Sequence, residues 1–388
     1  MELKKTLAIL FSMIFSLFLL SSCDDSSSEK EKGFVTVGNL DLKDLDNSSL
    51  IKIIIVEEDD FRALSNKICN DNITSPFELH VKSEDKVKEI PATSMYSCKM
   101  LRRVVFFDSS IQTIGEGAFK NTPKLVSFIP PESLEIIGAN AFSDSENLAI
   151  FSFTENIKTI GNNAFAKTGI ETINFPDNTK LQTIGDAAFI NTKNLLKITI
   201  PSSVELIDKG AFENSSIQTL NFKNIENPDD INTKKLVIGD SAFINCKQLN
   251  SSLNFPDHLT KIGIEAFSNT LVTHIGFNDN SKLEFIGRRA FSGNNSIASI
   301  TIPGLVKEIG EGIIAQNTAF NTNISVNFKP NLNHYDTWKL SATPPGVQVT
   351  DPNNYNPSGV GSSLATNLSL LRSENTKWNR NIPATATP

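Results

Sequence analysis

A nine-residue pattern recurs along the chain and constrains its fold more than any other feature. In LQTIGDAAF, which ends at Phe189, an apolar residue opens the copy, Ile-Gly lies at its centre and Ala-Phe closes it. Two worn copies end at Met95 and Ile314. The eight clear copies are 23, 23, 24, 23, 31, 24 and 24 residues apart and end at Phe119, Phe142, Phe165, Phe189, Phe212, Phe243, Phe267 and Phe291. A fixed period of this length predicts an array of stacked repeats.

Each copy has a second half after its Phe. In residues 189–201 a loop is followed by Leu195, Ile198 and Ile200, and then by Pro. The last two apolar residues alternate with polar ones, which indicates a strand with one buried face that ends at the Pro. Within the nonapeptide, Gly argues against a continuous helix because it costs about 1 kcal/mol in a helix interior. We expect a short extended segment through the Ile, a turn at the Gly and one helical turn that carries Ala and Phe inward.

A coil of 23 or 24 residues cannot bury its own apolar edge, so successive copies must stack. The repeat Phe residues then form a spine, which explains why the chain has 26 Phe against 3 Tyr and 2 Trp. A second column is expected at Phe128, Phe153, Phe175, Phe222, Phe255 and Phe277. The predicted fold is an α/β repeat solenoid of 23–24-residue coils, made mainly of short parallel strands with short helical turns.

These copies, LxxIGxxAF followed by LxxIxIP, resemble the BspA-like class of leucine-rich repeats over residues 87–330, about 60 per cent of the chain. The resemblance implies a right-handed superhelix, no catalytic residues and display on the surface of host-associated bacteria. It also implies adhesion to host matrix or serum proteins, or contact between cells. The chain departs from the pattern at an insertion of about eight residues between Phe212 and Phe243, at Asp208 in place of the Gly, and at Ser252-Leu253, which is out of step.

The N-terminus predicts export and a lipid anchor. Lys4 and Lys5 precede a predominantly apolar segment of 15 residues, 6–20, which is shorter than the roughly 20 residues that span a membrane but suits a signal peptide. Leu20-Ser21-Ser22-Cys23 is typical of a lipoprotein processing site, with Cys23 as the lipidated residue. We expect removal of residues 1–22, a flexible tether at 23–33, and anchoring to a bacterial membrane at the outer membrane or cell surface. Asp24 leaves an inner-membrane, periplasmic location open.

The flanks are expected to cap the array, because a terminal coil exposes an apolar face. Residues 34–86 predict a β-α-β cap, with strands at 50–56 and 77–82 and a helix at 57–68. After the solenoid, 87–330, residues 331–388 predict a C-terminal cap and a tail rich in Pro, Asn and Ser. Strand 324–328, Tyr335 and Trp338 could cover the last coil. From Ser341 we expect extended or disordered chain, with a possible short helix at 362–372.

Besides Cys23 the chain has Cys69, Cys98 and Cys246. This odd number allows at most one intramolecular disulfide, and Cys69 with Cys98 is the pair close in sequence. Isolated buried thiols are the alternative that the sequence favours.

No residue pattern predicts catalysis. The net charge of −7 comes from mixed acidic and basic residues, which excludes a basic face for nucleic acid. The four His show no metal-ligand spacing, phosphate loops and GxSxG are missing, and the acidic pairs Asp59-Asp60 and Asp229-Asp230 suit a helix start and a loop. The sequence therefore predicts a protein that is not an enzyme and has no cofactor or metal.

Two surfaces are candidates for binding. One is the loop within 224–235, with Asn227, Asp229 and Asp230. The other is the outward face of the main strands, with Ser127, Thr172, Asn174, Lys197, Thr199, Thr219, Asn221, His274, Ser299 and Thr301. These polar residues could equally reflect strand propensity and solubility.

The predicted function is that of a membrane-anchored, adhesin-like surface protein that contacts proteins of a host or of other cells. A periplasmic scaffold is one alternative. A carbohydrate-binding module is another, although the repeats lack the Trp and Tyr that sugar sites favour.

Overall fold

The structure, a computed structural model, describes residues 35–37, 51–55, 57–69, 75–82, 86–107, 110–226, 233–297, 299–310, 312–314, 325–328, 338–340 and 378–380. All of them belong to one compact unit, Phe34–Pro388. This unit is a solenoid of about ten stacked coils with parallel strands and little helix.

The isoleucines of the nonapeptide form one continuous row of parallel strands, called the first row. Equivalent residues lie opposite one another in successive copies, for example Ile137, Ile160 and Ile184. The row runs through β4 (Glu89–Ile90), β6 (Thr113–Ile114), β8 (Ile136–Ile137), β10 (Thr159–Ile160), β12 (Thr183–Ile184), β14 (Leu206–Ile207), β16 (Leu236–Ile238), β18 (Leu259–Ile262), β20 (Phe285–Ile286) and β22 (Glu308–Ile309).

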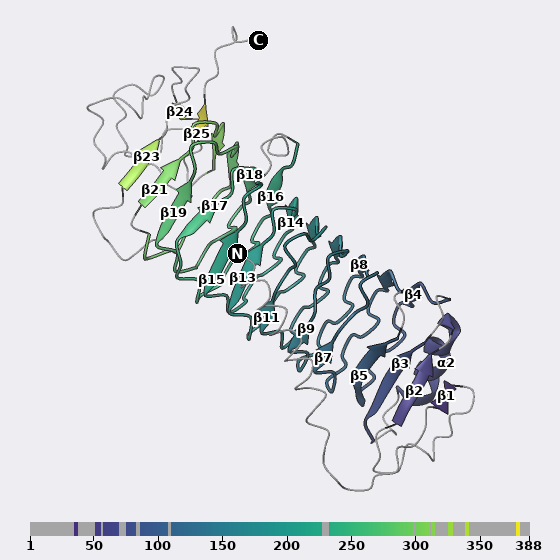
Figure 1. The fold of residues 1–388 in the computed structure, drawn as a ribbon. Coiled ribbons are helices and arrows are strands. Elements are labelled where there is room, and N and C mark those ends of the chain that lie inside the picture. The colour runs from purple at the N-terminus through teal and green to yellow at the C-terminus, as the bar shows by residue number, and fades with distance from the viewer. Residues whose placement is uncertain are drawn as a thin grey trace, which may run out of the picture. The chain divides into compact units, whose positions relative to one another are not determined.

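The strands after each loop form the second row, which lies beside the first (Figure 1). It comprises β5 (Leu101–Phe106), β7 (Ser127–Phe128), β9 (Ile150–Phe151), β11 (Thr172–Ile173), β13 (Lys197–Ile200), β15 (Thr219–Phe222), β17 (Leu253–Phe255), β19 (His274–Phe277), β21 (Ser299–Ile302) and β23 (Ser325–Phe328). Unlike the first row it is divided, into sheets β7–β9, β11–β13–β15 and β17–β19–β21–β23, while β5 belongs to the N-terminal sheet.

The break between β15 and β17 lies at the step predicted at Ser252-Leu253. Leu249 is followed by Leu253 after four residues, whereas Leu195 is followed by Ile198 after three. The extra residue shifts the strand relative to its neighbour, so the two strands belong to different sheets.

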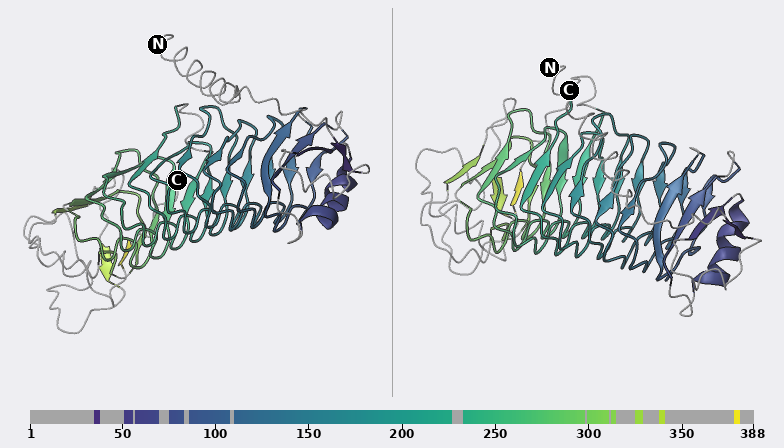
Figure 2. Two further views of the ribbon diagram at one scale, coloured as in Figure 1. Left: turned by 90° about the horizontal axis from the view of Figure 1, so that it is seen from below. Right: turned by 60° about the horizontal axis from the view of Figure 1, so that its bottom comes forward.

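Figure 2 shows the third side of each coil, the turn side, as a row of stacked turns, and hydrogen bonds between coils hold it. Gly117 N–H donates to Ala139 O at 2.8 Å, Phe119 N–H to Ala141 O at 2.7 Å and Asn121 N–H to Ser143 O at 2.8 Å, and later coils repeat this set. Bonds from residue i to i−3 close turns within each coil, as expected for helical turns. Left-handed residues such as Gly117 (φ 60°) and Asn121 (φ 58°) interrupt these turns, so no helix forms here.

The Gly after each Ile is required by close backbone approach. The predicted turn starts at this Gly, since Ala118 N–H donates to Gly115 O at 3.2 Å, and the left-handed residue of the turn lies two positions later, at Gly117. A Cβ on Gly263 would lie 2.4 Å from the carbonyl carbon of Gly239 and 2.5 Å from Asp240 N. At the exceptional position, Asp208 Oδ1 accepts a hydrogen bond from Lys209 N at 2.7 Å.

The repeat Phe side chains form the predicted spine. All eight are fully buried, and neighbouring rings from Phe119 to Phe291 stack with centroids 5.0–5.5 Å apart. The second column differs from the prediction because Phe128 stacks on Phe151, at 5.6 Å, and Phe153 instead contacts Phe175, at 4.9 Å. Phe151 takes the place predicted for Phe153 in the second column because it, and not Phe153, lies opposite Phe128 in the strand register.

A column of small polar side chains, not foreseen from the sequence, runs beside the spine three residues after each Phe. Thr122, Thr168 and Thr192 each donate from Oγ1 to the carbonyl oxygen of their own Phe, at 2.9–3.0 Å. Buried carbonyls need partners, so these hydroxyls complete the hydrogen bonding of the turn side. Cys246 occupies the same repeat position, and its thiol donates to Phe212 O at 3.2 Å.

The N-terminal segment has a β-α-β arrangement that continues the second row. Its strands β1 (Val35–Thr36), β2 (Ile51–Ile55) and β3 (Phe77–Val81) form a parallel sheet with β5, in the order β1–β2–β3–β5. Helix α2 (Glu58–Ile68) starts with a capping box at Glu57, buries Phe61, Leu64 and Ile68, and packs against β2 and β4. It thereby covers the apolar edge of the first coil.

Cys69, at the end of α2, forms a disulfide with Cys98 in the first coil. The preference for isolated thiols was therefore wrong for this pair. The bridge spans 29 residues and is worth about 3.6 kcal/mol in the chain-entropy description, so it ties the helix to the coil that it covers.

The last coil is extended by strands from the C-terminal tail. β25 (Trp378–Arg380) pairs antiparallel with β22, and β24 (Trp338–Leu340) pairs antiparallel with β25. The first-row sheet therefore continues past the repeats, and the tail contributes a strand that its composition does not predict. Tyr335 and the helix expected at 362–372 lie outside the described residues. In the described part of the chain no helix is long and apolar enough to cross a membrane.

The insertion between β15 and β16 starts and ends beside a buried histidine, His258. Asp257 N–H donates to Asn224 Oδ1 at 3.1 Å, and Leu236 N–H donates to His258 O at 2.9 Å. His258 is 1% exposed, and neither ring nitrogen has a hydrogen-bond partner. Burial lowers its pKa to about 4; Asp257 opposes this shift, and Lys234 adds to it.

Gly263→Ala is expected to lower the free energy of unfolding by about 1–3 kcal/mol, because its Cβ would force two backbones apart. Gly276→Ala is the control, since there the nearest atom, at 2.8 Å, belongs to the Asn254 side chain, which can rotate. Urea unfolding compares the two variants. Equal losses would contradict the close-approach explanation.

Because His258 is buried, we expect the protein to lose stability in acid. Its folded pKa is about 4 and its unfolded value about 6.5, so the unfolded chain binds more protons between these limits. The free energy of unfolding should therefore be highest above pH 6.5 and fall by about 3 kcal/mol as the pH drops towards 4.

The variant His258→Ser tests this, because Ser133 and Ser203 occupy the same position in other coils. Unfolding measured from pH 7 to pH 4 should depend less on pH than in the wild type. His274→Ser, at an exposed site, should keep the wild-type slope. An unchanged slope in His258→Ser would remove His258 as the cause.

Candidate functional site

Six of the residues predicted to form a binding face lie together on β11, β13, β15 and the residue after β11. In the strand register Thr172 is opposite Lys197, and Lys197 is opposite Thr219. Thr199 is likewise opposite Asn221, and Asn174 follows β11. The residues between them, Ile173, Ile198 and Leu220, are at most 4% exposed. Strict alternation across aligned strands therefore directs the polar set outward.

A surface hollow of about 310 Å³ lies within this group. Its lining combines polar groups with the edges of the core, namely Thr172, Ile173, Asn174, Phe175, Lys197, Ile198, Thr199, Pro201 and Lys223. Lys223 forms an ion pair with Asp177, an exposed residue of the loop after β11. Hydroxyl, amide and ammonium groups around an apolar floor can hold a polypeptide by hydrogen bonds and van der Waals contact.

The remaining predicted residues of the face are separate from this group. Ser127 lies on β7 and pairs with Ile150, while His274 on β19 pairs with Ser299 on β21, which also carries Thr301. The break between β9 and β11 divides β7 from the first group, and the break between β15 and β17 divides β19 and β21 from it. Asn227, Asp229 and Asp230 of the loop and the lipidation site Cys23 lie outside the described residues.

An exposed apolar cluster on neighbouring strands was missed from the sequence. Phe107 is 56% exposed, Val126 50%, Ile129 55% and Ile150 43%. Ile150 occupies the outward position that is polar in β7 and β11, which is the one sequence signal for the cluster. The exposed apolar cluster lies at the N-terminal end of the second row, on β9 and beside β5 and β7.

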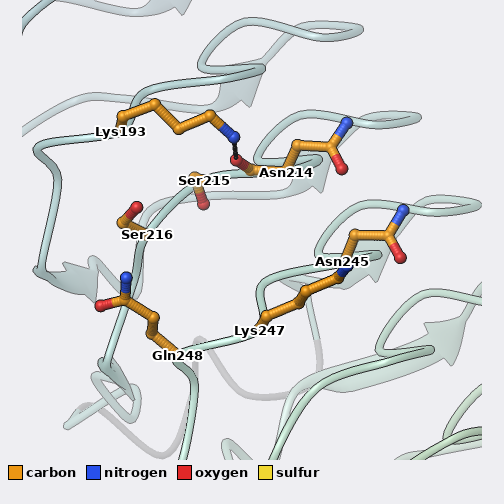
Figure 3. A pocket seen from close by; sticks show the side chains of 7 residues that line it. All are labelled: Lys193, Asn214, Ser215, Ser216, Asn245, Lys247 and Gln248. Carbon is orange, nitrogen blue, oxygen red and sulfur yellow. Dashed lines mark hydrogen bonds between the residues drawn. The ribbon is translucent and has the colours of Figure 1, made fainter.

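A second hollow, of about 230 Å³, opens where three coils turn from the spine into the second row. Figure 3 shows the side chains that line it: Lys193, Asn214, Ser215, Ser216, Asn245, Lys247 and Gln248. All are polar, two are cationic and none is a carboxylate. Lys193 Nζ donates to Asn214 O at 2.6 Å across one end.

The groups capable of chemistry are dispersed in the described part of the chain. His80 lies on β3 with Nε2 3.2 Å from Glu78 Oε2, His258 is buried at the insertion, and His274 is exposed; His334 lies outside the described residues. In those same ranges no three His, Cys, Asp or Glu side chains are arranged to hold a metal ion.

The free thiol of Cys246 is inaccessible and protonated. Burial raises its pKa to about 12, against hydrogen bonds from Ser215 that act in the opposite direction. A thiol with this pKa is not a nucleophile at neutral pH, so Cys246 has a structural role in the polar column.

Comparison with known proteins identifies the repeats. The sequence profile of the BspA type Leucine rich repeat region (6 copies) matches residues 72–182, 178–234 and 218–341, which together span 270 of the 388 residues. No curated protein matches the chain.

Several solved structures are similar. A leucine-rich repeat protein from Bacteroides ovatus ATCC 8483 is 23% identical, with a TM-score of 0.48, over 71% of this chain and 74% of that one. A leucine rich cell surface protein from Faecalibacterium prausnitzii A2-165 is 19% identical, with a TM-score of 0.36, over 73% and 84%. The pneumococcal vaccine antigen PcpA is 19% identical, with a TM-score of 0.35, over 67% and 68%.

Leucine-rich-repeat proteins generally bind other proteins and are generally not enzymes. The repeat pattern, the stacked coils and the profile match over more than half of the sequence agree, and the chain belongs to the family of BspA-type leucine-rich-repeat proteins.

Proposed function

We propose that this protein is an exported, lipid-anchored surface protein that binds proteins of a host or of other cells. The binding face is the outward side of β11, β13 and β15, and the observation that supports it most is the hollow of about 310 Å³ among aligned Thr, Asn and Lys side chains. Such a face offers hydrogen-bond donors and acceptors at fixed spacing on a rigid stack.

The anchor in this proposal is Cys23, joined to the first described strand through the tether 23–33. Two acyl chains on one cysteine supply stable membrane attachment, whereas a single chain binds reversibly. The chain would then be attached to the outer membrane at the N-terminal end of the solenoid, with residues 34–86 and 331–388 as caps. Asn227, Asp229 and Asp230 stay a second candidate contact on the same protein.

Attachment and display are tested on intact cells. We expect Cys23→Ser to move the chain from the membrane fraction into the soluble fraction, because no acyl chain can be added. Added protease should digest the wild-type repeats on intact cells, with a periplasmic enzyme as the control that stays protected. Full protection of the repeats would contradict surface display and support the periplasmic scaffold.

The face is tested with paired arginine substitutions. Thr172→Arg with Thr219→Arg places two bulky charges beside the hollow, and adhesion of cells to immobilised matrix and serum proteins should fall by about tenfold or more. The control is Thr159→Arg with Thr183→Arg, an aligned Thr pair on the first row that adds the same charge. Equal adhesion by both double variants would contradict the assignment of the binding site to this face.

A further inference from the structure

The second hollow arises from a difference in corner length between coils. Leu195 lies six positions after Phe189 and Leu249 six positions after Phe243, but Ile217 lies only five positions after Phe212. Leu195, Ile217 and Leu249 are all fully buried, so each corner must reach the same depth in the core. The middle corner therefore reaches less far outward than its two neighbours, and a notch remains between them.

The residue at the tip of the short corner decides whether the notch stays open. Two other coils have five-residue corners, and their equivalent residues are Gly169 and Leu271. At Gly169 the neighbouring Asn194 side chain donates to the carbonyl oxygen at 3.3 Å, and Leu271 is a large side chain. Ser216 is small, and together with the six polar residues around it lines the open space seen in Figure 3.

Two of the amide side chains that line the hollow, those of Gln248 and Asn245, have their oxygen atoms occupied by hydrogen bonds. Gln248 Oε1 accepts from Gln218 Nε2 at 3.0 Å, and Asn245 Oδ1 accepts from Asn269 Nδ2 at 3.0 Å. This leaves the amide nitrogens of Gln248 and Asn245 as donors at the hollow. In the described ranges, Lys247 Nζ has no hydrogen-bond or ion-pair partner.

The charged side chains that line the hollow are both positive. Lys193 and Lys247 occupy the same repeat position two coils apart, on either side of Ser216. The nearest carboxylate in the short corner, Glu213, accepts from Asn214 Nδ2 at 3.3 Å and does not line the hollow. Two ammonium groups and amide donors without a carboxylate form a site for anionic oxygen atoms.

We propose that this hollow binds acidic side chains of the partner protein, and thus selects partners with an acidic extended segment. This rests on the proposed protein-binding function, because the hollow lies at the start of β15, whose outward residues belong to the binding face. Two coils separate the lysines by roughly 10 Å, which corresponds to about three residues of extended chain. Two carboxylates three residues apart match both lysines. Protein is favoured over sugar because no aromatic side chain lines the hollow.

The test uses the chain from Cys23 onward with Cys23→Ser and a labelled Gly/Ser peptide that carries two Glu residues three positions apart. Fluorescence anisotropy should show saturable binding that weakens with added salt. The same peptide with Gln in place of Glu should bind about fivefold or more weakly.

Three variants locate the site. Lys193→Gln with Lys247→Gln should weaken peptide binding about fivefold or more, and the control, Lys124→Gln with Lys209→Gln, removes the same charge from exposed positions elsewhere and should change it less than about twofold. Ser216→Leu keeps the charge but fills the notch with the residue found at Leu271, and it should abolish binding. Circular dichroism checks that each variant is folded.

Equal weakening by both lysine pairs would overturn the proposal, because net charge alone would then explain binding. Wild-type affinity in Ser216→Leu would also overturn it. Binding of heparin without binding of the peptide, lost in the same variants, would replace the acidic peptide by an anionic glycan. Failure of the peptide to bind, with adhesion still lost in the Thr172 and Thr219 double variant, would reject this site and leave the proposed function standing.

Discussion

The constant step between coils is the constraint on which the rest of the structure depends. Stacked Phe rings repeat at 5.0–5.5 Å, close to the spacing of about 4.8 Å between hydrogen-bonded strands. Spine and strands can therefore share one register. The Gly after each Ile permits this step, because a Cβ on Gly263 would collide with the backbone of the preceding coil. Once the step is fixed, residues at like positions align on every side.

The arrangement of the coils could be predicted because it depends on buried positions with few acceptable residues. Phe and Ile recur at those positions, and their spacing gave the coil length and the outward face. The turn at the Gly was predicted, but the sequence pattern alone does not show that close contact with the neighbouring backbone also requires Gly at this position. The strand Trp378–Arg380 was missed because its partner, Glu308–Ile309, lies some 70 residues earlier and only the folded chain brings them together.

The candidate sites were predictable to different degrees. Thr172, Lys197 and Thr219 were expected side by side because alternation and period together define a column. The two hollows were not expected, since they depend on how far each corner extends. The one at Ser216 follows from a corner of five residues between corners of six, a difference visible in the sequence once the buried residue that ends each corner is known. The disulfide between Cys69 and Cys98 needed the position of α2, which the repeat pattern does not contain.

The hydrogen bonds of the turn side all have the same direction along the chain. In each coil the N–H groups of this ladder donate to the next coil, and the carbonyl groups of the next coil accept. On this side, every junction between coils therefore has the same hydrogen-bond chemistry. Duplication or loss of a whole coil would restore a complete set of bonds without altering either end. Such a protein can change its length in units of one coil during evolution, and its recognition surface can grow or shrink while the caps stay the same.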